Sequence, residues 1–140
     1  MAVLSIRFKR SDAYERLTRA AANSTESISA LGERLIDEGL RMQAHPGVVF
    51  RDGPTGRRAA IAAGPDVWEV VTVLRDLDGP LERRVVDAGD QLGLSSSQVR
   101  AASRYYAEYS EEIDEEIGAN DAAADRELAA WEAERRLLSE

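Results

Sequence analysis

The stretch Ala2–Asp12, AVLSIRFKRSD, decides the fold of the first part of this 140-residue chain. From Leu4 to Phe8 every second side chain is a large apolar one, and these are Leu4, Ile6 and Phe8. The positions between them form a mostly polar and basic set, which consists of Val3, Ser5, Arg7 and Lys9. Alternation with a period of two predicts a short β-strand that has one apolar and one basic face.

This strand has no obvious neighbour in its own half of the chain, because the residues that follow it, up to about residue 44, have the pattern of helices. Its backbone N–H and C=O groups still need partners, and the same strand of a second copy can supply them. The result is a two-stranded antiparallel ribbon with its apolar side chains buried on the helices below. The basic face then points outward, and a ribbon of this width fits the DNA major groove.

Two short helices are expected after the strand. The first has Tyr14, Leu17 and Ala21 on one side, and Asn23-Ser24 interrupts it. Ser24 or Thr25 is expected to cap the second helix, whose apolar stripe includes Gly32, either a point of close approach for the same helix of a second copy or a tolerated glycine. The expected dimer core is Leu4, Ile6, Phe8, Leu31 and Leu35.

The strand followed by YERLTRAAANSTESISALGERLIDEGLR (residues 14–41) resembles the ribbon-helix-helix fold of small dimeric repressors and antitoxins. The resemblance implies a homodimer formed through the N-terminal strand, with operator DNA as its partner. It also implies a phosphate contact where the second helix begins. The implied DNA-binding residues are Ser5, Arg7, Lys9, Ser24 and Thr25. The competing interpretation is an ordinary N-terminal strand of a mixed domain.

Beyond a boundary at Gln43–Gly47, two short extended runs flank the Gly/Pro-rich segment RDGPTG and predict a β-hairpin. Three helical segments follow, with expected capping boxes at Asp66/Glu69 and Ser95/Gln98. The lone histidine, His45, is interpreted as a linker residue. We therefore expect a mainly α chain with short β elements and three parts: residues 1–43, residues 44–118 with a trihelical helix-turn-helix-like domain, and a helical tail, residues 119–140.

The block from His45 to Ile113 resembles the helix-turn-helix-like domain of unknown function that accompanies antitoxins of PIN-like ribonuclease toxins. Gly89, Gly93 and Val99 carry the small-residue, turn-glycine and buried-aliphatic spacing of such a motif. It departs from the resembled domain by an interruption at Asp76–Leu81. Arg100 and Arg104 allow a second DNA contact, but acidic residues follow closely. A scaffold for dimerisation or toxin contact is favoured over groove binding.

The tail carries an apolar stripe with a tryptophan among acidic residues, which suits the groove of a partner protein. In the resembled antitoxins such tails wrap the toxin, and an arginine enters its acidic pocket. The toxin-binding residues implied in this way are Leu128, Trp131, Arg135, Arg136 and Leu138. Packing of the tail on its own dimer is an equally weighted alternative.

Charge is distributed unevenly in this chain of net charge −8. Residues 1–23 hold five basic and two acidic side chains, whereas residues 108–140 hold twelve acidic and three basic ones. This asymmetry fits a DNA-contacting head and a tail that meets another partner. The chain lacks cysteine, and neither an apolar run long enough for a membrane nor a signal-peptide core is evident, so we expect a cytoplasmic protein.

Catalysis is not expected, because the acidic run at residues 108–117 has no histidine, nucleophile or phosphate-binding loop beside it. We expect no metal and no cofactor. The favoured hypothesis is an antitoxin of a type II toxin–antitoxin system that neutralises a PIN-like ribonuclease and represses its own operon. The alternatives are a stand-alone ribbon-helix-helix regulator whose C-terminal domain oligomerises or senses a ligand, and a protein-interaction module without a DNA role.

Overall fold

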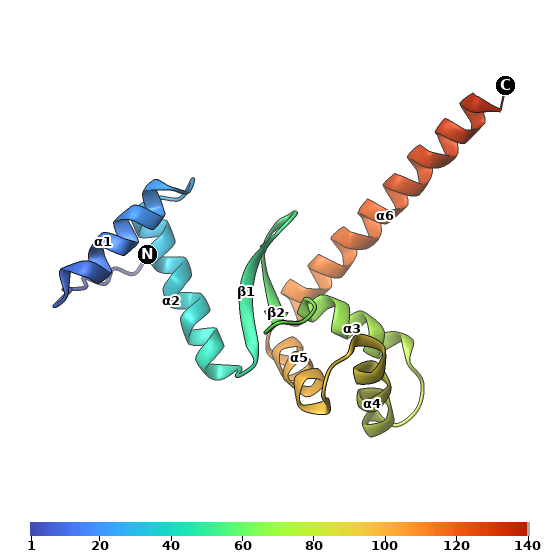
Figure 1. Cartoon of the computed structure of the whole chain (residues 1–140), viewed down its shortest axis with the longest axis horizontal. Helices are drawn as coiled ribbons and strands as arrows, with labels where there is room; N and C mark the ends of the chain where they lie inside the picture. The colour runs from blue at the N-terminus through green and yellow to red at the C-terminus, as the bar shows by residue number, and fades with distance from the viewer. Residues whose placement is uncertain (140) are drawn as a thin grey trace. The chain divides into compact units, whose positions relative to one another are not determined.

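The computed structural model describes residues 1–139 and divides them into two compact units, residues 1–44 and residues from 45 onward. Across the described residues there are six α-helices and one two-stranded antiparallel hairpin (Figure 1). The prediction of a mainly helical chain with a β-hairpin is therefore confirmed.

The first unit consists of an extended arm and two helices, α1 (Ser11–Ala22) and α2 (Ile28–Ala44). Residues 1–10 form no strand within the described chain, so the predicted N-terminal strand is not present in the single chain. The physical reason is that strand formation needs hydrogen-bonding partners along a second backbone, and the rest of this unit is helical. Among the hydrophobic residues of the unit, Ala21 and Leu31 are buried.

The second unit begins with the hairpin of β1 (Val48–Gly53) and β2 (Gly56–Ile61), joined through Pro54 and Thr55. Val48 is paired with Ile61 at the open end and Gly53 with Gly56 at the turn. Gly56 has φ +127°, a conformation that side-chain-bearing residues rarely adopt, so glycine suits the second position flanking this tight turn. The local turn residues thus account for the predicted hairpin.

Three helices follow the hairpin: α3 (Val67–Asp76), α4 (Leu81–Leu92) and α5 (Ser96–Glu108) (Figure 1). Helices α3 and α5 pack against the hairpin, and α4 packs against α3 and α5. Both predicted capping boxes are present. The Glu69 side chain accepts a hydrogen bond from the Asp66 N–H at 2.8 Å, and Ser95 Oγ accepts one from the Gln98 N–H at 3.2 Å.

The turn between α4 and α5 depends on two glycines. Gly93 ends α4 in the left-handed conformation, with φ +69°. Gly89 lies one turn earlier, where an added Cβ would be 2.5 Å from the backbone oxygen of Leu94. After Gly93 the backbone at Leu94 passes so close to Gly89 that position 89 has no room for a side chain.

The hydrophobic core of the described residues lies in this second unit. Its largest fully buried side chains come from the hairpin and from α3 to α6, and they are Tyr105, Ile61, Ile113, Val48, Val67, Val70, Val85 and Val99. The last helix, α6 (Ser110–Leu138), packs against this core through Ile113 in its first turn. It then continues as a straight helix away from the other elements of the unit (Figure 1).

Candidate nucleic-acid and partner interfaces

The N-terminal arm presents all of its side chains to solvent. Its apolar residues decrease in exposure toward α1, from 75% at Leu4 to 56% at Ile6 and 39% at Phe8. Phe8 is the most covered because its ring meets Tyr14 of α1 edge-on, with 5.5 Å between ring centroids. Ser5, Arg7 and Lys9 are also exposed, so the predicted DNA-binding residues of the arm are accessible.

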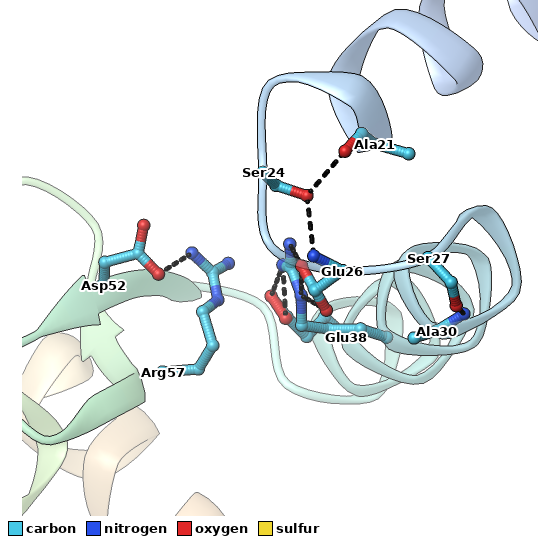
Figure 2. Close-up of polar contacts among 9 residues, drawn as sticks. Ala21, Ser24, Glu26, Ser27, Ala30, Glu38, Asp52 and Arg57 are labelled. Atoms are coloured by element: carbon cyan, nitrogen blue, oxygen red, sulfur yellow. Dashed lines mark hydrogen bonds and ion pairs between the residues drawn. The ribbon is translucent and has the colours of Figure 1, made fainter.

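The start of α2 differs from the expected capping arrangement. Ser27, rather than Ser24 or Thr25, caps the helix, because its Oγ accepts a hydrogen bond from the Ala30 N–H at 3.1 Å (Figure 2). Ser24 instead shapes the turn that precedes α2: its Oγ donates to the Ala21 carbonyl and accepts from the Glu26 N–H, both at 3.1 Å. Thr25 is exposed in the same turn. The predicted cap was therefore two or three residues too early.

The two predicted core residues of α2 differ in their surroundings. Leu31 is buried within the unit, whereas Leu35, one turn further on, is 48% exposed. Two glycines flank Leu35 on the same stripe, Gly32 and Gly39, and an added Cβ at either one would meet nothing within 4 Å. In the single chain, this stripe is an exposed apolar surface, and the two glycines leave depressions in it because they have no side chain.

An ion-pair network that sequence inspection missed fixes the entry into α2. Arg34 donates from Nη2 to Glu26 Oε1 at 2.8 Å and from Nη1 to Glu38 Oε2 at 3.2 Å. Bonding to Glu26 is the main influence that raises the pKa of Arg34 above its ordinary value. The i,i+4 spacing of Arg34 and Glu38 was a visible signal, but the Glu26 contact crosses the cap and was not.

The arginines of α3 to α5 form interactions within the second unit. Arg100 pairs with Glu82 at 2.5 Å, and Arg83 pairs with Asp87 at 3.3 Å. Arg75 pairs with Asp114 at 2.5 Å, which lowers the pKa of that carboxyl group. Arg84 donates to the Leu74 carbonyl.

At the hairpin turn, Arg57 pairs with Asp52 at 3.3 Å (Figure 2). Pairing with carboxylates reduces the net positive charge that these arginines present to DNA phosphates.

His45 is not the free linker residue that its Pro-Gly surroundings suggested. Its side chain is only 9% exposed, its Nε2 lies 2.6 Å from Glu108 Oε2, and its ring meets Tyr105 and Tyr109 edge-on. The contact with Glu108 spans 63 residues, which explains why local sequence could not reveal it. Among the described residues, no group of three histidine, cysteine or acidic side chains is placed to hold a metal ion.

The predicted tail residues lie on an uncovered helix. From Gly118 to Ser139, every residue of the chain except the partly covered Ala123 is exposed. Leu128 and Trp131 are each about half exposed, at 53% and 51%, and Leu138 is 77% exposed. The Arg135 guanidinium carbon lies 4.7 Å from the centre of the Trp131 ring, so these two side chains form a cation–π pair. Arg136 is exposed beside them.

Within the part of the chain that the structure describes, no helix is both long and apolar enough to span a membrane. Comparison with protein-family models, with curated proteins and with solved structures finds no match to this chain.

Proposed function

We propose that this chain is a homodimeric antitoxin that binds operator DNA through a ribbon-helix-helix module and neutralises a PIN-like ribonuclease toxin. The observation that supports a dimeric DNA-binding module is the very small hydrophobic core of the first unit. In this 44-residue unit the buried hydrophobic residues are Ala21 and Leu31, and burial of these two side chains cannot offset the entropy cost of ordering the chain. Units of about 40 residues are marginal on their own, and oligomerisation, a metal or disulfides usually stabilise the smallest of them. This sequence has no cysteine.

A second copy accounts for the exposed apolar side chains of the unit. Pairing two N-terminal arms as antiparallel strands satisfies their backbone groups and turns Leu4, Ile6 and Phe8 toward the helices. On α2, Ile28, Leu35 and Met42 recur every seven residues, and each is at least 40% exposed. Gly32 and Gly39 lie between them on the same stripe, so two α2 helices can approach closely with large side chains set against glycines.

The same pairing places Ser5, Arg7 and Lys9 of both copies on the outer face of the ribbon. Arg7 is the central residue of this set and the one best suited to bidentate contact with a guanine edge. We expect Arg7→Ala to weaken specific operator binding by about 1–3 kcal/mol, roughly 5- to 150-fold, without loss of the dimer. The measurement is a titration against the DNA upstream of its own coding sequence and against a scrambled fragment of equal length, at one salt concentration.

Arg10→Ala is the matched control. The Arg10→Ala substitution removes the same charge from the same segment. Arg10, however, falls on the opposite face of the alternation and pairs with Asp12 at 3.3 Å. Its loss should reduce binding to both DNA fragments alike, since it affects only the general attraction to phosphates. Equal loss of specificity in the two variants would contradict the proposed ribbon.

The tail supports the toxin-binding part of the proposal. In proteins most of the stability of a helix comes from packing of its amphipathic face, and the exposed part of α6 has no such packing in the single chain, so a partner that covers it would stabilise it. The second unit has its own core and paired arginines, which suits a scaffold that carries this arm. Capture of partners from native cells, with the full chain beside a version ending at Gly118, tests this part. A small ribonuclease that copurifies only with the full chain is the expected result.

A stand-alone regulator is the second candidate function. It is favoured by the self-contained core of the second unit, which has no need of a partner and could oligomerise or sense a ligand. If operator binding is retained and neither version captures a ribonuclease, this candidate replaces the antitoxin.

A further inference from the structure

A buried arginine lies between the hairpin and the neighbouring segments of the second unit. Arg58 of β2 is 8% exposed, and its Nη2 donates to Thr55 Oγ1 at 2.6 Å. Its Nη1 lies 3.7 Å from Asp66 Oδ2, and its buried Nε has no hydrogen-bond partner among the described residues. Asp66 is itself shared, since Arg51 donates to its Oδ1 at 2.8 Å and Trp68 Nε1 to its Oδ2 at 3.0 Å.

Glu116 of α6 has a half-buried side chain, and the charges of Arg58 and Asp66 in this cluster act on it. Its Oε2 atom is fully buried and has no hydrogen-bond partner in the described chain. Loss of solvation, followed by the nearby charge of Glu112, raises the pKa of Glu116 to about 7. Asp66 acts in the same direction, and Arg58 opposes both. Arg58 cannot fully compensate because its charge is already shared with Asp66.

Several charged groups on the elements around Glu116 have partners of their own. From α3, Glu69 accepts the Asp66 N–H at 2.8 Å, and Arg75 pairs with Asp114. From α5, the Tyr105 hydroxyl donates to Glu112 Oε2 at 2.7 Å. Ionisation of Glu116 therefore adds a negative charge beside two carboxylates without adding a hydrogen bond for its buried oxygen.

The turns of α6 that carry Glu116 also attach this helix to the core. Ile113 is fully buried, and Ile117 packs against the core from one turn further along. Beyond Ile117 the helix is almost entirely exposed. Glu116 thus lies at the last point where α6 is held by the rest of its unit.

We propose that this attachment is a proton-operated latch: the base of the exposed arm is held firmly when the Glu116 carboxyl group is protonated and loosens when that group ionises. The inference concerns the second unit alone and does not depend on the proposed DNA or toxin partners. Its consequence is that pH controls how firmly the arm formed by the rest of α6 is anchored.

The direction follows from proton linkage. We call α6 docked when its first turns are packed on the core. A carboxyl group whose pKa rises from 4.5 to about 7 on docking stabilises the docked state at low pH, and this stabilisation is lost as pH rises through 7. If the undocked group has its ordinary pKa of 4.5, the equilibrium constant for local opening increases about tenfold between about pH 6 and about pH 8. Partial exposure of Glu116 makes this an upper value.

The test is amide hydrogen exchange of residues 113–117 in the full chain at both pH values, corrected for intrinsic exchange. In the native protein we expect protection to fall up to tenfold on going from about pH 6 to about pH 8. In Glu116→Gln, which is neutral at both pH values, protection should not change with pH. Glu115→Gln is the matched control, because Glu115 is the exposed neighbour on the same helix, and this variant should behave like the native protein.

Three results would overturn the latch: pH-independent protection in the native protein, a pH effect that persists in Glu116→Gln, or its loss in Glu115→Gln. If Glu116→Gln does not fold, a carbon-13 NMR titration of the Glu116 carboxyl group in the native protein decides. A midpoint near 7 supports the latch, and a midpoint near 4.5 refutes it.

Discussion

Replacement of Ile6 by aspartate tests whether the N-terminal arm is the seam of a dimer. In the single chain, the exposed fractions of Leu4, Ile6 and Phe8 together amount to about 1.7 complete side chains. Complete burial of such side chains stabilises by about 1.5–3 kcal/mol each, so this face contributes about 5–10 kcal/mol to a dimer of two chains. Association costs roughly 4–15 kcal/mol, so the arm alone barely offsets it, and the stripe on α2 must contribute as well.

Because Ile6 is 56% exposed, its loss removes about 2–3 kcal/mol of this gain per dimer. Two carboxylates buried on the apolar face add a further penalty of at least a few kcal/mol. Dimer dissociation should therefore become more than about 1,000-fold more favourable, and the dimer should be lost at micromolar concentration. Sedimentation equilibrium over a range of protein concentrations measures this change.

Val3→Asp is the control for the Ile6→Asp experiment. Val3 is 87% exposed and falls on the predicted outer face, so the same charge in the same segment should leave the dimer intact. A native-like dimer of Ile6→Asp would refute the ribbon, because an aspartate cannot be accommodated twice at its apolar seam. Equal dissociation of Val3→Asp would show that charge in the arm, rather than burial, controls association.

Three further predictions concern the second unit. Gly89→Ala should lower the free energy of unfolding by about 1–3 kcal/mol in a denaturant titration, because the added Cβ would lie 2.5 Å from the Leu94 carbonyl oxygen. Gly118→Ala is the control: position 118 has open space around it, so this variant should be neutral or slightly stabilising. Ser95→Ala should cost about 1 kcal/mol by the same measurement through loss of the cap of α5, and no change would show that the capping box contributes nothing to stability. Trp131→Ala should leave the thermal midpoint unchanged but reduce capture of the proposed toxin, since Trp131 is about half exposed on the tail. A marked drop in the midpoint would mean that the tail packs on its own protein.

The elements that could be predicted are those specified by neighbouring residues. The hairpin follows from the glycines and proline of its turn, and the capping boxes at Asp66/Glu69 and Ser95/Gln98 follow from spacing within one helical turn. The cap of α2 was misplaced because Ser24, Thr25 and Ser27 are all competent cap residues. Only the structure shows that the turn itself uses the Ser24 hydroxyl.

Contacts between distant residues were not predictable in the same way. The pairing of His45 with Glu108, and the influence of Arg58 and Asp66 on Glu116, depend on how the hairpin and helices pack. The N-terminal arm is a different case. Its alternation is clear in the sequence, but no strand forms in the single chain, and the proposed pairing with a second copy would be needed to supply its hydrogen-bonding partners. The DNA-binding and toxin-binding residues remain predictions for the same reason, since each requires a partner.

The two units are stabilised by different means, and this bears on how the proposed regulator would work. The second unit has a core of its own, so its folding need not depend on association with a second copy. The first unit has almost no core, so on the proposed function its folding is coupled to association, and the fraction of DNA-competent molecules rises with concentration. A repressor of its own operon would benefit from this coupling. DNA binding would be weak while the protein is scarce and would strengthen as it accumulates, while the second unit and its tail stay available to a toxin throughout.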